Sequence, residues 1–337
     1  MTAARCARLL LGAFLLVLAA TGCVGDRDAL TIYSGRGENL VGPLLERFSE
    51  ETGIGIDVRY GDSADLALLV GEEGERTPAD VFYSQSPGAV GFLAERGLLA
   101  ALGEGVLAEV DERFESPQGL WVGLTGRRRV LVYNDELVSP DELPESVFDV
   151  TEEPYAGQVA LAPSNASFQD FVSVMRQVEG DERARAWLEA MAESDAPTYA
   201  NNNAIVEAVG RGEVPMGLVN HYYNERFLAE DPGLPSRNYV FPNGDLGSIV
   251  LITTASILRT TDHREEAERF ISFLLSEEAQ EFFAEETFEY PLAAGVEPAA
   301  DDLPSLGSVD LPKYSIDELG GELQGTVRMI AESGLEG

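Results

Sequence analysis

Two adjacent tyrosines, Tyr222 and Tyr223, are the residues of this chain whose types and spacing best suit a chemical role. A phenolate is a hard, anionic oxygen donor, and Fe3+ is a small, hard cation that favours such ligands. The metal must displace the phenol proton, whose pKa is ordinarily about 10. The residues that follow, NERFLAE, have helical character, so we expect the pair at a strand-to-helix turn, where neighbouring side chains can share one centre. Taken alone, such a pair also fits an ordinary core or surface position.

The elements that would position this pair alternate between strands and helices. In the first hundred residues the apolar pattern predicts strands at 29–33, 54–60 and 79–83, and helices at 40–51, 63–73 and 87–96. This alternation predicts an α/β fold with a parallel sheet that is covered on both faces. Ligands of such sheets lie beyond the carboxyl ends of the strands, so the loops at 34–37 and 84–88 are expected to face a ligand.

The rest of the chain repeats the pattern. Further strands are expected at 130–134, 158–161, 214–219 and 248–258, and helices at 168–177, 182–193, 204–212, 264–275, 277–285 and 316–332. The proline-rich stretch 291–312 lacks periodicity and is expected to wrap around the molecule. We therefore expect two α/β lobes joined by two crossing strands, with a ligand cleft between them. Residues 23–121 and 246–337 would form lobe 1, including the wrapping segment and the last helix, and residues 122–245 would form lobe 2.

The N-terminus predicts export. Arg5 and Arg8 precede an apolar stretch, 9–20, that is too short to span a bilayer, and small residues lead into Cys23. This pattern predicts a lipoprotein signal peptide at 1–22 and a lipid on Cys23, which would anchor the mature chain to a membrane. Ordinary signal cleavage beside an incidental cysteine is the alternative. Because Cys6 lies inside the signal, the mature chain would have one cysteine, which excludes an internal disulfide and a Cys-based zinc site.

The charge balance excludes one large class of partners. The 337 residues carry 59 acidic and 23 basic side chains, which gives a formal net charge of −36. No basic stripe exists to neutralise phosphates, so we expect no nucleic-acid binding. The acidity could serve as a cation trap, but a heavily solvated surface explains it more simply.

Six blocks of the sequence stand in the order typical of one family: IYSGRGENLVGPLLERFSEETGI, PADVFYSQSPGAVGFLAERGLL, WVGLTGRRRVLVYN, LAPSNASFQDFVSVM, NNNAIVEAVGRGEVPMGLVNHYY and GSIVLITTASIL. Over nearly the whole mature chain the sequence resembles the ferric-iron-binding proteins of bacterial ABC importers, often called bacterial transferrins. The resemblance implies the two-lobed, type II periplasmic-binding-protein fold. It also implies Fe3+ bound in the cleft with a small synergistic anion, such as carbonate or phosphate.

By position, the resemblance makes Tyr222 and Tyr223 the paired metal ligands and Tyr133 a third ligand. Three phenolates would cancel the charge of Fe3+. Some relatives place a histidine in the first loop, where this chain has Gly37 and Glu38. Glu38 could replace it as a ligand, or it could be a solvated residue at the start of a helix.

Missing coordination positions need oxygens from outside the protein, and carbonate or water fits best. Arg36 is our first candidate to hold the carbonate and Arg127 our second, because a guanidinium presents a planar donor fork to a planar oxyanion. Arg128 is expected to face solvent. The loop before the helix at 168–177 adds amides that favour an anion. Its candidates are Ser164, Asn165 and Ser167, with capping of the helix as the structural alternative, and the expected supporting residues are Gln85, Asn203, Asn220 and His221, the last in an orienting role.

These observations predict an extracytoplasmic, monomeric lipoprotein that captures Fe3+ and delivers it to a separate ABC permease and ATPase. The same fold with another ligand, such as an oxyanion, a phosphonate or a polyamine, is the alternative. We do not expect an enzyme, because the sequence has no G-x-S-x-G elbow, no H-E-x-x-H motif and no P-loop.

Overall fold

The computed structural model describes residues 29–293, 295–298, 306, 314–319 and 322–335. The expected signal peptide, Cys23 and much of the expected wrapping segment lie outside these residues.

The strands form one mixed sheet in the order β2-β1-β3-β9-β5-β7-β6. Strands β1, β2 and β3 are parallel, as the alternation predicted, but β9 runs antiparallel to β3 and to β5. Three shorter strands pair outside this path, β4 and β8 among them. The strand bounds are β1 Leu30–Ser34, β2 Ile56–Tyr60, β3 Val81–Ser84, β4 Leu99–Ala100, β5 Val122–Asn134, β6 Val159–Ala160, β7 Met216–Asn220, β8 Ser236–Tyr239, β9 Val250–Leu258 and β10 Tyr290–Pro291.

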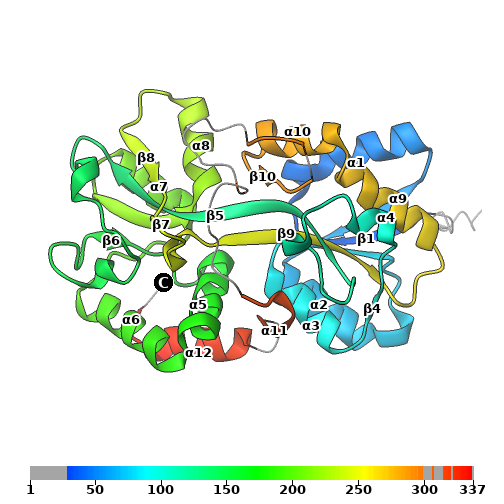
Figure 1. Ribbon diagram of the computed structural model, residues 1–337, viewed down its shortest axis with the longest axis horizontal. Coiled ribbons are helices and arrows are strands. Elements are labelled where there is room, and N and C mark those ends of the chain that lie inside the picture. Colours follow the sequence, from blue (N-terminus) through cyan, green and yellow to red (C-terminus); the bar gives the residue numbers. More distant parts are fainter. Residues whose placement is uncertain (1–28, 294, 299–305, 307–313, 320–321, 336–337) are drawn as a thin grey trace, which may run out of the picture.

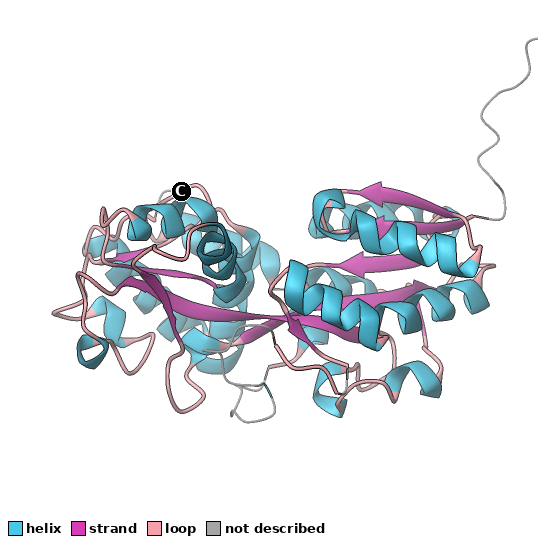
Figure 2. Ribbon diagram, turned by 90° about the horizontal axis from the view of Figure 1, so that it is seen from above, coloured by secondary structure: helices cyan, strands magenta, loops and turns pink. Residues whose placement is uncertain are grey.

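Two lobes lie side by side, and β5 and β9 run between them (Figures 1 and 2). The first half of β5 pairs with β9, and its second half, from Arg129 on, pairs with β7 and β8. Strand β5 therefore passes from lobe 1 into lobe 2, as one of the two expected crossing strands. It begins eight residues earlier than the apolar pattern indicated, because glycines and three arginines interrupt that pattern at 123–129.

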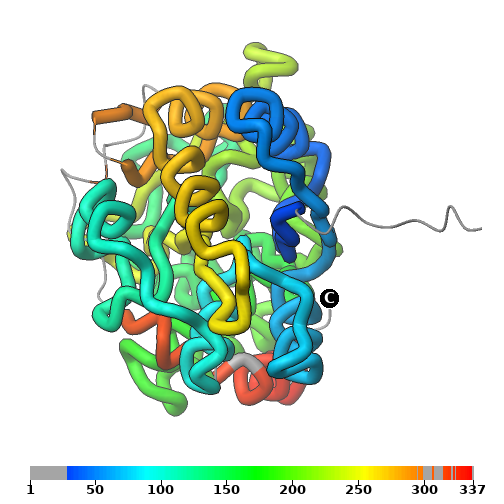
Figure 3. The backbone as a smooth tube through the Cα atoms, turned by 90° about the vertical axis from the view of Figure 1, so that its right-hand side faces the viewer, coloured from blue at the N-terminus to red at the C-terminus, as the bar shows by residue number. Residues whose placement is uncertain are grey.

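Helices cover both faces of the sheet in each lobe. Lobe 1 contains α1 Glu38–Thr52, α2 Ser63–Glu73, α3 Pro87–Glu95, α4 Glu104–Leu107, α9 Arg264–Leu274 and α10 Glu277–Glu286, and lobe 2 contains α5 Ala166–Glu179, α6 Asp181–Glu193, α7 Asn202–Gly210 and α8 His221–Glu230. Short 3-10 turns lie at Gly74–Arg76, Glu112–Phe114, Pro140–Glu142, Asp149–Thr151 and Leu246–Ser248. Figure 3 views the molecule from the lobe 1 end, where α1, α9 and α10 cover one face of the sheet and α2 and α3 the other.

Each lobe has its own apolar core. In lobe 1, Phe48 of α1 packs edge-on against Phe270 of α9, with ring centroids 5.1 Å apart. In lobe 2, Phe171 of α5 packs against Trp187 of α6 at 5.8 Å. Strands β3, β7 and β9 are buried along their whole length, as expected for strands that are covered on both faces.

The C-terminal helices connect the lobes. Helix α11, Ile316–Leu319, lies against α3 of lobe 1, whereas α12, Leu323–Glu332, packs on α5 and α6 of lobe 2. Arg176 of α5 donates to the Thr326 hydroxyl at 2.9 Å and to the backbone oxygen of Glu322 at 3.0 Å. The expectation that the last helix returns to lobe 1 is therefore not what the structure shows. Among the described residues, no helix combines the length and apolarity that crossing a membrane requires.

Candidate metal and anion site

The tyrosine pair lies at the turn from β7 into α8, as the sequence indicated. Tyr222 is buried, Tyr223 is partly exposed, and their rings stack with centroids 4.2 Å apart and planes at 28°. Burial raises the pKa of Tyr222 well above its ordinary value, and the Tyr223 phenol adds to this, whereas the charge of Arg127 opposes it. Both phenols can converge on one centre, but a cation must supply the free energy that deprotonates them.

His221 fixes the start of α8. Its Nδ1 accepts the backbone N–H of Arg128 at 3.1 Å, so its Nε2 carries the proton and donates to the Phe288 carbonyl at 2.7 Å. Burial lowers the pKa of the imidazole to about 4, which keeps it neutral. Both ring nitrogens are occupied, which suits the orienting role that we expected.

Strand β5 contains three consecutive buried arginines. Each is at most 2% exposed: Arg127, Arg128 and Arg129. The expectation that Arg128 faces solvent is wrong. Along a strand it shares a face with Val130, which lies in a core cluster with residues of α7, while the other face packs against α5. Both faces of β5 are covered, so no arginine at this position can reach solvent on that strand.

Within the part of the chain that the structure describes, the hydrogen-bond acceptors of Arg129 are all neutral. It donates to the Leu218 carbonyl at 3.0 Å, to Asn220 Oδ1 at 3.4 Å and to Ser167 Oγ at 3.5 Å, and its guanidinium lies 5.4 Å from the Phe171 ring centre. Burial lowers its pKa to about 9, although phenolate charge on the tyrosine pair would act in the opposite direction. A buried cation with long bonds to neutral groups is a favourable place for an anion.

The loop before α5 contributes further polar groups near Arg129. Asn165 caps the helix, because its Oδ1 accepts the Ser167 backbone N–H at 3.0 Å, and the Ser167 hydroxyl donates to the same oxygen at 2.6 Å. Asn202 then donates to the Ser167 hydroxyl at 3.2 Å. Asn202 is buried and Asn203 is exposed, so the middle asparagine of the triplet, which we did not select, is the one in this network. Ser164 is exposed.

Arg36 already has an anionic partner. Its Nη2 lies 3.0 Å from Glu289 Oε2, with both side chains about 1% exposed, and its Nη1 donates to Gln85 Oε1 at 3.3 Å. Burial is the largest influence on the pKa of Arg36 and would lower it, but the Glu289 carboxylate together with Tyr83, Tyr222 and Tyr223 raises the pKa overall. Sequence reasoning missed Glu289, because nothing in TFEYP distinguishes it from the many surface glutamates. Arg127 donates to the Gln85 carbonyl, which places Gln85 between the two arginines.

Two predicted residues lie elsewhere. Glu38 is an exposed residue at the start of α1. Tyr133 is buried four residues beyond Arg129 on β5, about 13 Å along the strand. It pairs with Met216 and Arg237, whereas Arg129 pairs with Asn220 just before the tyrosine pair. Tyr133 packs in the core cluster that includes α5 and α6, whereas Tyr223 packs against the cluster that includes α7.

The junction has more buried positive charge than its side chains balance. Of the four buried arginines, only Arg36 has an ion pair among the described residues. Several buried polar atoms here also lack a protein partner, namely Arg36 Nε, Arg127 Nε, Arg128 Nε and Nη1, Glu289 Oε1, Asn202 Oδ1 and Asn220 Nδ2. Phenolates and an oxyanion would supply the missing negative charge and acceptors. The described residues contain no cluster of three His, Cys, Asp or Glu side chains suited to a metal.

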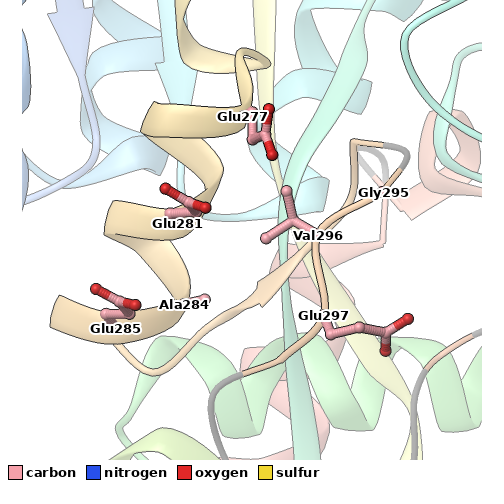
Figure 4. A pocket seen from close by; sticks show the side chains of 7 residues that line it. All are labelled: Glu277, Glu281, Ala284, Glu285, Gly295, Val296 and Glu297. Carbon is pink, nitrogen blue, oxygen red and sulfur yellow. The ribbon is translucent and has the colours of Figure 1, made fainter.

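A separate pocket lies on lobe 1 (Figure 4). Glu277, Glu281 and Glu285, one turn apart on α10, line it together with Glu297 and the short stretch before it. All four glutamates are exposed. This surface fits the solvated acidic exterior that the composition indicated.

Comparison with known proteins identifies the family of the chain. Residues 76–312 match the model of the bacterial extracellular solute-binding protein family. The Fe(3+)-binding periplasmic protein of Serratia marcescens is 30% identical over 331 residues, which cover 97% of this chain and 96% of that protein. Iron-bound HitA from Pseudomonas aeruginosa superposes with a TM-score of 0.83 at 33% identity, over 91% of this chain and 99% of that one.

A second solved structure, Trichodesmium IdiA (FutA) in complex with iron and citrate ligands, superposes with a TM-score of 0.79 at 26% identity. It covers 91% of this chain and all of that one. The chain has the fold of the type II periplasmic binding proteins. It belongs to the bacterial extracellular solute-binding proteins and, within them, to the periplasmic ferric-iron-binding proteins.

Proposed function

We propose that this chain is an extracytoplasmic receptor that binds Fe3+ through Tyr222 and Tyr223, together with an oxyanion, and delivers the ion to an ABC permease. The observation that carries the proposal is the stacked pair of phenols, beside arginines that need negative charge. The names of the relatives from Serratia marcescens and Pseudomonas aeruginosa support ferric iron as the cargo.

Binding would proceed by exchange of protons for metal. Fe3+ displaces the protons of both phenols, and two phenolates leave one positive charge on the ion. An oxyanion then fills the remaining positions and neutralises the buried arginines. We place it against Arg129 and the amides of the Asn165–Ser167 loop, with Arg127 on its other side, because Arg129 has no carboxylate partner. Carbonate suits this place because it is small and planar.

Closure of the lobes would retain the ion. Contacts already cross the junction, since Ser86 of lobe 1 donates to Asp170 of α5 at 2.9 Å and His221 donates to Phe288. Opening would bend β5 and β9, the strands that connect the lobes, and a ligand that touches both lobes would shift the equilibrium toward the closed form.

The setting of the receptor belongs to the same proposal. A lipid on Cys23 would hold a monomeric receptor at the membrane, beside a separate permease and ATPase. Tyr133 would add a third phenolate only if the protein rearranged along β5.

One spectrum tests the central assignment. The purified apo protein, titrated with Fe3+ in bicarbonate buffer, should develop the visible absorption band that arises when phenolate transfers charge to ferric iron. A protein that binds an oxyanion, a phosphonate or a polyamine but gives no such band with Fe3+ would have the alternative function.

A further inference from the structure

The segment between α10 and β10 brings lobe 1 against the tyrosine pair. Phe288 has a φ of 58°, in the left-handed region that bulky residues rarely adopt. Its carbonyl is bonded to His221, the residue directly before Tyr222. In Figure 1, α8 and the α10–β10 segment face each other at the junction of the lobes. A strained backbone is thus retained where it meets the start of the tyrosine helix.

Glu289, the next residue, is held by one oxygen only. Its Oε2 accepts from Arg36 at 3.0 Å, from the Thr125 hydroxyl at 3.0 Å and from the Thr287 hydroxyl at 3.4 Å. Its Oε1 is buried and has no partner among the described residues. A buried carboxylate oxygen without a donor or a cation costs free energy, so its retention calls for an explanation.

The backbone contact brings this carboxylate toward the tyrosine pair, since Phe288, which precedes Glu289, accepts from His221, which precedes Tyr222. Glu289 is also the ion-pair partner of Arg36, at 3.0 Å. A role as the counterion of Arg36 accounts for Oε2, but it leaves Oε1 and the strained turn at Phe288 without a reason.

We propose that Glu289 is the lobe 1 ligand of the iron site: Arg36 holds Oε2, and Oε1 binds the ion that Tyr222 and Tyr223 take up. This inference rests on the proposed function and deepens it. A carboxylate is a hard oxygen donor like a phenolate, and Glu38, the other acidic candidate, is exposed at the start of α1.

The proposal also settles the charge of the site. Two phenolates and one carboxylate together cancel the charge of Fe3+, which is the role that three phenolates would otherwise have. The oxyanion is then left to balance Arg127 and Arg129 rather than the metal. One ligand from lobe 1 and two from lobe 2 would make closure of the lobes depend on the ion itself.

The test replaces Glu289 by Gln, which keeps the shape and removes the charge. Fe3+ affinity is measured by competition with citrate, and the wavelength of the visible band is recorded. We expect the Fe3+ affinity of Glu289→Gln to be weaker by a factor of roughly 10 to 100. The band should move to longer wavelength, because iron that has lost an anionic ligand accepts charge from phenolate more readily. Glu286→Gln, an exposed position on the same segment, is the matched control and should change neither quantity.

Arg36→Gln separates ligation from ion pairing, because it removes the pair and keeps the carboxylate. We expect it to weaken iron binding less than Glu289→Gln does. If the two variants lose affinity equally and the band stays at the wild-type wavelength in both, Glu289 is only the partner of Arg36 and the proposal is overturned.

Two further readouts keep the test decisive. Should Glu289→Gln fail to fold, the double variant Arg36→Gln/Glu289→Gln leaves no unpaired buried charge and should show the same loss of iron and the same band shift. Wild-type affinity in that double variant would also overturn the proposal. Absence of any band in the wild-type protein, in contrast, would contradict the proposed function itself.

Discussion

The buried arginines of the two lobes have different hydrogen-bond partners. In lobe 1, Arg36 has a carboxylate partner at 3.0 Å, and Glu289 raises its pKa despite burial. On the lobe 2 half of β5, Arg129 is equally buried but contacts only neutral oxygens, and its pKa falls to about 9. Among the described residues, Arg129 therefore has no ion-paired carboxylate, which is also true of Arg127 and Arg128, whereas Arg36 is paired within the protein.

Two buried tyrosines also differ in their charged neighbours. Tyr222 and Tyr133 are both buried and both have raised pKa values, with burial as the main cause. The charged neighbours of Tyr222 are Arg127, Glu289 and Arg36, whereas those of Tyr133 are Asp135 and Arg237. Burial therefore does not distinguish the two tyrosines, whereas their charged neighbours differ.

Removal of one phenolate from the pair should have the largest effect. Tyr222→Phe keeps the ring and deletes the ligand oxygen, so we expect Fe3+ affinity to fall by more than about 100-fold, the upper limit usual for outer contacts. The visible band should weaken or disappear in the same titration. Tyr199→Phe is the control, because Tyr199 packs in the same cluster as Tyr223 but has Glu213 and Arg211 as its charged neighbours. Unchanged affinity and colour in Tyr222→Phe would refute the central assignment.

Acid should release the ion with a steep dependence on pH. In the apo protein the raised pKa keeps Tyr222 protonated throughout the range from pH 4 to 8, so binding must expel its proton at every pH in this range. For each proton that binding releases, the apparent Fe3+ affinity falls about tenfold when the pH falls by one unit. Release from both phenols makes the affinity fall roughly 100-fold per unit. Competition with a chelator at several pH values gives the slope. A slope of zero would mean that phenolates are not the ligands.

Much of the fold was readable from the sequence. The strands of lobe 1 and the turn that carries the tyrosine pair follow directly from periodicity, and the family assignment agrees with the expected fold and with a solute-binding component that is not an enzyme. The start of β5 was not readable, because three consecutive arginines resemble a solvated turn. Only pairing with β9 and cover on both faces reveals that residues 122–129 form a buried strand.

The sequence predicts the positions of some residues of the candidate site. The Tyr222–Tyr223 pair and Asn165 lie at the ends of predicted elements, where side chains converge. Glu289 was missed because it lies 253 residues from Arg36 along the chain, and Asn202 was missed because a triplet of asparagines does not show which one turns inward. Such choices are made by tertiary packing rather than by local pattern.

The different partners of Arg36 and Arg129 predict which of the two makes iron binding depend on bicarbonate. Arg129→Gln should reduce Fe3+ affinity about tenfold and remove most of its dependence on added bicarbonate, because a charge-assisted bond to the anion contributes about 1.5–3 kcal/mol. Arg36→Gln should retain that dependence, since Arg36 is already paired with Glu289. The two variants are compared in bicarbonate-free and bicarbonate-containing buffer. Loss of the bicarbonate effect in Arg36→Gln, with retention in Arg129→Gln, would reverse our assignment and restore Arg36 as the anion-binding residue.

The smallest effect should come from the third tyrosine. Tyr133 lies in the lobe 2 core, opposite Met216 and Arg237 and about 13 Å along β5 from the level of Asn220. If this geometry persists in the loaded protein, Tyr133→Phe changes Fe3+ affinity by less than about threefold and leaves the visible band in place, because a hydroxyl that does not touch the ion contributes about 1 kcal/mol to folding stability rather than to iron binding. The resemblance to relatives with three tyrosine ligands predicts the opposite, a loss comparable to that in Tyr222→Phe. Titrating both variants under identical conditions decides between the two. A large loss of Fe3+ affinity in Tyr133→Phe would show that lobe 2 rearranges around iron. Tyr133, rather than Glu289, would then be the third anionic ligand.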